Sequence, residues 1–192
     1  MSNLDKTDEL LRNFINEMPT LMNGKNLVEK YVMNFKDSYD IFGYKTEIDN
    51  SYKQFEGWLN DLFDKEKAQD DILAFNFGLY ETEDSIQLYI TGSKEWDYDD
   101  EDWACNNDYF PEGRYPNIAL YNNLYSSLQD NFQVGLFLTI ATTIIFANTY
   151  AVSNSTNFLE GKEFIVFATG FDDGDLYNFS KLNKEGITAI EC

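Results

Sequence analysis

The chain has 192 residues, of which 43% are hydrophobic and 17% aromatic, and this predicts a folded protein with a substantial core rather than a disordered chain. Its 34 acidic and 14 basic residues give a net charge of −20, which argues against nucleic acid or an anionic membrane as a direct partner, because both bind basic surfaces. The chain contains no histidine, so it cannot form a Ser-His-Asp or Cys-His catalytic arrangement or a His-ligated zinc site.

Three stretches of the N-terminal third carry hydrophobic residues at helical spacing. They run from Leu10 to Met18, from Leu27 to Phe35 and from Tyr52 to Phe63. Asn26 stands where the N-cap of the second helix is expected, with Glu29 three residues further on. We therefore expect three amphipathic helices in this part of the chain.

The pattern then changes to an alternation of side chains with a period of two. Residues 75–80 and 86–91 alternate in this way, which predicts two strands, and the polar link Glu81–Asp84 predicts a hairpin between them. Residues 106–117 mix Asn, Asp, Pro and Gly with aromatic residues and indicate an irregular loop.

The most apolar part of the chain follows. Residues 118–128 have helical spacing, and Phe132–Tyr150 is apolar nearly all round, which predicts a helix buried on every side. Its Thr and Ile residues leave a strand as the alternative, but its length favours a helix. The apolar stretch Val134–Ala147 spans 14 residues, fewer than the ~20 needed to cross a bilayer, so we expect a core helix and no membrane partner.

Two further strands are expected near the C-terminus, at residues 164–168 and 176–179, with a tight turn at 170–174. The order of helices, hairpin, helices and hairpin predicts an α+β fold. Within it we expect N-terminal helices, an antiparallel sheet built from hairpins, and a buried central helix.

No linker-like segment divides the chain. We therefore expect one domain over residues 1–192, with a helical part at 1–70 and a mixed sheet and helix part at 71–192.

The two cysteines, Cys105 and Cys192, are too few for a disulfide framework. The N-terminus lacks the basic and apolar segments of a secretory signal, so we expect a protein of the cytoplasm. Cys105 lies among acidic residues, which disfavour a reactive thiolate, and no catalytic residue is predicted in this chain.

Three aspartates, Asp172, Asp173 and Asp175, surround Gly174 in the predicted C-terminal turn. Carboxylates at this density could hold Ca²⁺ or Mg²⁺, although the spacing of an EF-hand is not met. Asp and Gly also favour a plain turn, because Asp bonds to local backbone amides and Gly accepts unusual dihedral angles. We predict a turn without a metal and no cofactor, with these aspartates as the metal-site alternative.

The segment Glu95–Trp103 holds six carboxylates and three large aromatic residues in nine positions, with no base among them. Residues 71–116 around it carry twelve acids and two bases, half of the net charge in under a quarter of the chain. Charge of one sign with interleaved rings is typical of a surface that meets a cationic partner. The alternative is a solvated acidic loop whose tryptophans fold back onto the core. The candidate partner-binding residues are Glu95, Trp96, Asp97, Tyr98, Asp99, Asp100, Glu101, Asp102 and Trp103.

Three motifs, Ile90–Glu95, Asp99–Pro111 and Thr169–Tyr177, resemble those of small acidic bacterial immunity proteins, which neutralise the toxin domains of polymorphic and contact-dependent toxin systems. The resemblance covers about Phe75 to Leu182, and the N-terminal helices carry none of it. It implies a cytoplasmic inhibitor that binds its cognate toxin, with Glu95–Trp103 as the contact segment.

We therefore expect a non-enzymatic protein that neutralises a basic protein partner, with the cognate toxin domain as the first candidate. A basic nuclease domain would suit such a surface, because a row of carboxylates mimics the charge spacing of a nucleic-acid backbone. The alternative is a carboxylate-based or metal-assisted hydrolase, although the 34 acids single out no catalytic pair. A third possibility is a structural or regulatory subunit that conditions a basic partner without inhibiting it.

Overall fold

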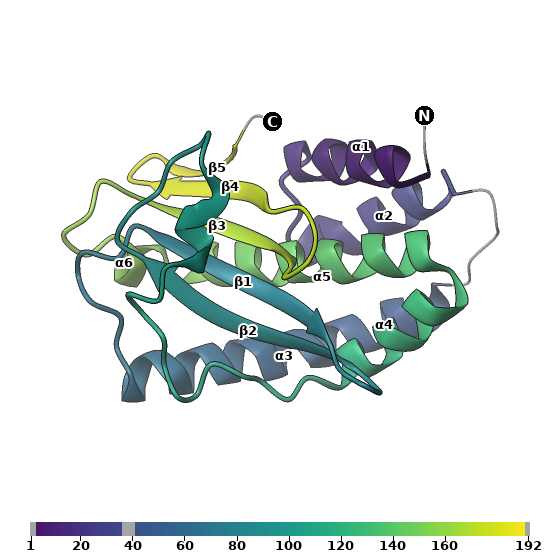
Figure 1. The fold of residues 1–192 in the computed structure, drawn as a ribbon, viewed down its shortest axis with the longest axis horizontal. Coiled ribbons are helices and arrows are strands. Elements are labelled where there is room, and N and C mark those ends of the chain that lie inside the picture. Colours follow the sequence, from purple (N-terminus) through teal and green to yellow (C-terminus); the bar gives the residue numbers. More distant parts are fainter. Residues whose placement is uncertain (1–2, 36–40, 191–192) are drawn as a thin grey trace.

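A computed structural model of the chain describes residues 3–35 and 41–190. In chain order its elements are α1 (Asn3–Asn16), α2 (Leu21–Val32), α3 (Phe42–Lys65), β1 (Ala74–Glu81), β2 (Ile86–Ser93), the 3-10 helix η1 (Glu101–Cys105), α4 (Ala119–Asp130), α5 (Phe132–Ser153), α6 (Ser155–Phe158), β3 (Phe164–Phe171), β4 (Tyr177–Asn183) and β5 (Gly186–Ala189). Figure 1 shows the strands in one sheet that lies in front of the helices α3 and α5. The predicted α+β class is confirmed.

The five strands of this sheet lie in the order β2-β1-β3-β4-β5. Both predicted hairpins are antiparallel, but they join through β1 and β3, which run parallel, so the sheet is mixed rather than wholly antiparallel. The helices α4 to α6 connect β2 to β3 and return the chain to the end of the sheet where β1 begins. Parallel pairing requires a long connection of this kind.

The main core lies between the helices and one face of the sheet. Phe55 of α3 contacts both Phe77 of β1 and Phe146 of α5, with ring centroids 5.7 and 5.4 Å apart. The helix α5 runs through this core, which confirms the predicted buried central helix. By length and composition α5 could cross a membrane, but 89% of its most apolar window is buried inside the fold, the setting of a core helix.

Buried polar side chains on α5 connect it to other elements. Asn148 donates to the backbone oxygen of Pro19, between α1 and α2, and its Oδ1 accepts from Ser180 of β4 (3.0 and 2.8 Å). Thr142 and Thr143 donate to backbone oxygens four residues earlier in the same helix. Because these groups are satisfied, the polar residues of α5 do not oppose its burial.

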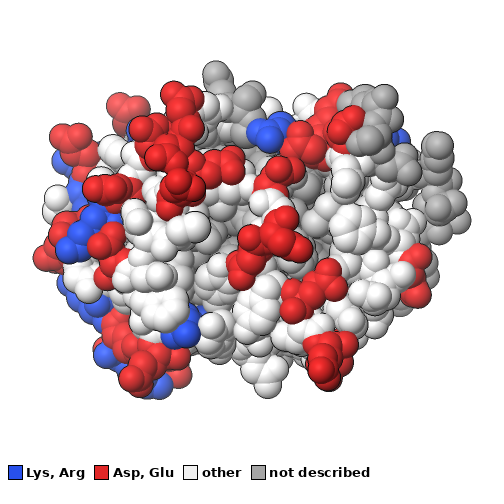
Figure 2. All heavy atoms as spheres, in the orientation of Figure 1, with Lys and Arg blue, Asp and Glu red and all other residues white. Residues whose placement is uncertain are grey.

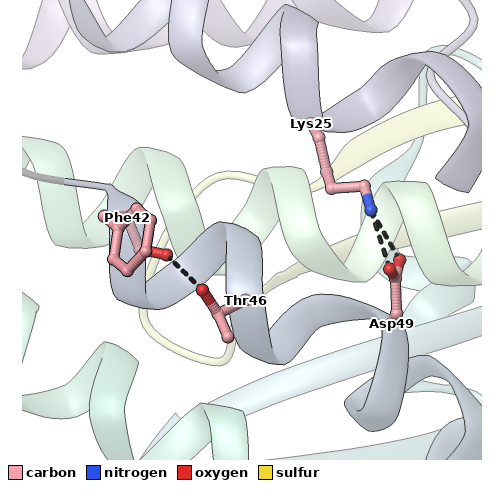
Figure 3. A network of polar contacts seen from close by, with 4 residues as sticks. All are labelled: Lys25, Phe42, Thr46 and Asp49. Atoms are coloured by element: carbon pink, nitrogen blue, oxygen red, sulfur yellow. Dashed lines mark hydrogen bonds and ion pairs between the residues drawn. The ribbon is translucent and has the colours of Figure 1, made fainter.

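The helices α2 and α3 are joined by ion pairs on the surface. Lys25 donates to both carboxylate oxygens of Asp49 (2.9 and 2.8 Å), and the hydroxyl of Thr46 donates to the backbone oxygen of Phe42 in the first turn of α3 (2.9 Å; Figure 3). Lys45 of α3 pairs with one carboxylate oxygen of Glu29 in α2.

The prediction that Asn26 caps the second helix is wrong. The helix α2 begins at Leu21, and its N-cap is Thr20, whose backbone N–H donates to Oδ1 of Asn23 (2.7 Å). Asn26 is an exposed residue inside the helix. The capping residues follow Pro19 directly, so the chain turns into the helix earlier than the apolar spacing indicates.

Candidate functional site

The sheet has a second face, here called the open face, that points away from α3 and α5. Along β1 it carries Asn76, Gly78 and Tyr80, which alternate with the core residues Phe77 and Leu79. A second, smaller hydrophobic cluster covers part of this face, with the buried residues Ala74, Trp103, Val166, Ala168 and Ile190.

The segment Glu95–Trp103 lies over this smaller cluster. Trp103 is buried, with 4% of its surface exposed, so it supports the segment from beneath rather than facing a partner. Trp96 is half-buried; its indole N–H donates to Oδ1 of Asn178, and its ring makes a T-shaped contact with the ring of Phe164. Tyr98 is the exposed ring of the three. Both tryptophans thus fold back onto the sheet, as the loop alternative described.

All six carboxylates of this segment are exposed. Asp97 and Asp100 accept hydrogen bonds from the backbone N–H groups of Asp99 and Asp102, two residues further on (2.9 and 3.0 Å). Within the described part of the chain none of these six carboxylates forms an ion pair, and the adjacent Lys94 pairs with Asp71 instead. The negative charge of the segment is therefore not neutralised within the described part of the chain.

The predicted turn at residues 170–174 is confirmed, although β3 extends to Phe171 and the turn itself follows it. The backbone N–H of Gly174 donates to the oxygen of Phe171 (2.9 Å). No group of three or more metal-ligating side chains comes together among residues 3–35 and 41–190, so Asp172, Asp173 and Asp175 are not assembled into a metal site.

Asp172 has a different contact. Its carboxylate accepts a hydrogen bond from the hydroxyl of Tyr89, 83 residues earlier in the chain (2.5 Å). Burial, together with this carboxylate, raises the pKa of Tyr89. Gly78 and Gly170 are paired neighbours on the open face, and Gly78 also pairs with Tyr89. A Cβ on Gly78 would lie 2.0 Å from the ring of Tyr89, so glycine allows the ring to cross β1 toward Asp172.

The open face carries a hollow of about 560 Å³, here called the open-face hollow. It is lined by sheet residues, by the end of the acidic segment with η1, by the loop at 106–117 and by the turn after β3. Its acidic residues are Glu101, Asp102 and Asp172, and no Lys or Arg is among its described lining residues. The two acidic segments singled out in the sequence therefore meet at one concave surface. Figure 2 shows acidic side chains spread across this view of the molecule, with basic ones mainly at its left margin.

Aromatic rings form one wall of this hollow. Tyr80, Tyr89 and Tyr115 contact one another, with centroids 6.1 to 6.3 Å apart. Beside them the guanidinium of Arg114 lies 3.8 Å from the centroid of Phe110 and 4.5 Å from that of Tyr115.

The floor of the hollow includes a polar group that the sequence analysis did not single out. Asn76 is 7% exposed, and its Oδ1 has no hydrogen-bond partner among the described residues. The alternation of Asn76, Gly78 and Tyr80 with core residues is the signal that could have assigned them to an open face.

A second hollow of about 540 Å³ lies on the other side of the turn after β3, and Phe171 and Gly174 line both. It combines the exposed apolar residues Leu4 and Phe132 with acidic side chains, among them Asp173 and Asp175. The acidic turn thus stands as a ridge between two hollows.

No family model matches the chain, and neither curated proteins nor solved structures give a match.

Proposed function

We propose that the chain is a non-enzymatic cytoplasmic protein that binds and neutralises a basic protein, with a cognate toxin domain as its partner. One observation carries the proposal. Acidic residues from two segments about 70 residues apart in sequence line one hollow: Glu101 and Asp102 end the segment 95–102, Asp172 begins the segment 172–175, and the described lining contains no base.

The state of these carboxylates supports a binding role. Those of the segment at 95–102 are exposed and make no ion pair within the described chain, so a basic partner would not have to displace an internal one. Charge of one sign on a concave surface raises the rate of encounter with an oppositely charged protein. The half-buried Trp96 and the buried Trp103 hold the segment against the sheet, which reduces the entropy lost on binding.

The hydrolase alternative has less support from the geometry. Glu101, Asp102 and Asp172 are exposed to solvent, whereas a carboxyl that acts as a general acid is normally set in an apolar, water-poor site. No specific observation favours it over binding.

The function can be tested by growth. If a long reading frame lies directly upstream of this gene, that frame is induced in a host cell, alone and together with this chain; unrelated metabolic genes at that place would count against the proposal. We expect growth arrest by the frame's C-terminal domain, relief by the wild-type chain, and loss of relief with a six-amide variant in which Glu95, Asp97, Asp99, Asp100, Glu101 and Asp102 become Gln or Asn.

The matched control changes six exposed acids elsewhere to amides: Glu9, Asp64, Glu83, Asp130, Glu163 and Glu185. This control has the same net charge as the six-amide variant and should still relieve the arrest. Equal relief by both variants would contradict the proposed surface, and no relief by the wild-type chain would contradict neutralisation of that domain.

A further inference from the structure

Taking the proposed function as its basis, we propose that the open-face hollow receives the guanidinium group of an arginine side chain from the basic partner. Besides its negatively charged rim, the hollow has three features that suit such a ligand: an unpaired acceptor in its floor, a wall of rings, and glycines that give it its shape.

The acceptor is Oδ1 of Asn76. An acceptor that is buried without a partner costs free energy, so such groups in folded proteins usually have a partner, a water or a ligand. Asn76 lies on the open face of β1 in the floor of the hollow, with 7% of its surface exposed, and Oδ1 lacks a donor among the described residues. The oxygen itself is covered in this rotamer, and a half-turn of the side-chain amide brings it to the surface of the hollow, where a ligand that donates an N–H group would satisfy it.

The rim supplies further hydrogen-bond acceptors, and these are negatively charged. Glu101 and Asp102 come from η1, and Asp172 comes from the turn after β3. A ligand that fills the hollow can therefore meet acceptors from two sides and from the floor. This arrangement needs several donors that point in different directions, and the five N–H groups of a guanidinium provide them.

The wall of the hollow is made of rings that can stack on a planar cation. Tyr80, Tyr89 and Tyr115 face the same hollow with Phe110. The chain's own Arg114 shows the compatibility of these rings with a guanidinium, because its Cζ lies 3.8 Å from the centroid of Phe110. Arginine stacks on aromatic faces more readily than lysine does, which favours arginine as the occupant.

The shape of the hollow depends on two glycines. Gly78 lets the ring of Tyr89 lie across β1, and a Cβ on Gly170 would lie 2.4 Å from the backbone oxygen of Asp175. The turn that carries Asp172 can therefore fold close to the sheet. These contacts place the wall, the rim and the floor around one space.

The test uses a probe that does not require the partner. A seven-residue peptide with a single central arginine between Gly and Ser residues, capped at both ends, is titrated into the isotope-labelled full chain and followed by NMR. Two matched peptides carry lysine or citrulline in place of arginine. Citrulline has nearly the shape of arginine but no charge.

We expect amide shifts concentrated around Asn76, Thr91, Cys105 and Asp172, with the arginine peptide bound about fivefold more tightly than the lysine peptide and no saturable binding of the citrulline peptide. Asn76→Val and, separately, the exposed Asp172→Asn should each weaken the arginine peptide several-fold. The six-acid control variant should bind it as the wild-type chain does.

Equal affinity for arginine and lysine, shifts outside the hollow, no effect of either variant, or no shifts at all would each overturn the inference. Such a result together with intact neutralisation in the growth test would leave the proposed function standing. Arginine-specific binding without neutralisation in the growth test would support the arginine site and contradict the proposed function.

Discussion

The hydroxyl of Tyr89 donates a hydrogen bond to Asp172 across the width of a strand that neither residue belongs to. Tyr89 lies on β2 and Asp172 follows β3, while β1 runs between them. The bond is possible because Gly78 of β1 has no side chain beneath the tyrosine ring. One glycine in the sheet therefore determines where an acidic turn and an aromatic wall meet.

Gly78→Ala should disturb this contact. The added Cβ would lie 2.0 to 2.5 Å from two ring carbons and the hydroxyl oxygen of Tyr89, so the side chain must move and its bond to Asp172 is lost. We expect the free energy of unfolding to fall by about 1–2 kcal/mol, as for other overpacked sites. Urea unfolding followed by circular dichroism measures this, and arginine-peptide binding should be lost with it.

Gly57→Ala is the matched control. Gly57 is exposed within α3, and a Cβ there meets nothing within 4 Å. Alanine favours a helix over glycine by about 1 kcal/mol, so this variant should be more stable than the wild-type chain. A loss of stability of the same size in both variants would refute the steric role given to Gly78.

Asn76→Val should raise stability while it weakens the binding of the arginine peptide. The wild-type side chain buries an acceptor that has no partner among the described residues, and such a group costs about 1–3 kcal/mol. Valine removes the acceptor and suits a strand, so we expect the free energy of unfolding to rise by about 1 kcal/mol. Urea unfolding measures this change in the free energy of unfolding. A clear loss of stability would mean that Asn76 has a structural role instead.

The sequence predicts the helix α5 well and the start of α2 poorly, for physical reasons that differ. Burial on every side leaves a continuous apolar pattern, and the threonines that suggested a strand satisfy their hydroxyls within the helix, as Thr142 does with the oxygen of Leu138. The cap at Thr20 depends on one contact with Asn23, which apolar spacing does not reveal. The strand β5, near the C-terminus, was missed because its four residues are too few to show a period.

The candidate site was predicted in pieces. The acidic segment Glu95–Trp103 and the turn at Asp172 stand out as local patterns, and their chemistry can be read from the sequence. Their meeting depends on the parallel pairing of β1 with β3, which leaves no local signal because the partners are far apart in sequence. The sequence pattern shows Asn76 and Tyr89 only as alternate residues of two strands. That both line one hollow follows only once the order of the strands in the sheet is known.

The stability of the chain should fall at high pH through its buried tyrosines, and Tyr150 gives a measurable case. Burial first, and then Glu56 and Asp64, raise the pKa of Tyr150 to about 12, while an unfolded tyrosine has a pKa of about 10. A raised folded-state pKa contributes stability that is complete below about pH 10 and is lost as the pH rises toward 12. Urea midpoints between pH 8 and 11.5 should decline, and Tyr150→Phe should reduce the slope. An unchanged slope would mean that Tyr150 does not contribute to the decline.

Trp103→Ala should loosen the attachment of the segment Glu95–Trp103 to the sheet without changing the charge of the segment. The side chain of Trp103 is 4% exposed and packs in the smaller cluster beneath Glu95–Trp103, so its removal leaves a cavity where the segment is attached. Large aromatic truncations of this kind cost about 3–5 kcal/mol when the whole fold depends on them. All six carboxylates remain, so the net charge does not change.

We therefore expect Trp103→Ala to lose neutralisation in the growth test although its charge equals that of the wild-type chain, and to become sensitive to limited proteolysis near residues 95–102. Asp49→Asn is the control for a surface change, because its exposed ion pair with Lys25 is worth less than about 1 kcal/mol. The contrary result is a Trp103→Ala chain that is folded at the assay temperature and still neutralises fully. It would mean that the charge of the segment is sufficient for binding even when the segment is not attached to the sheet.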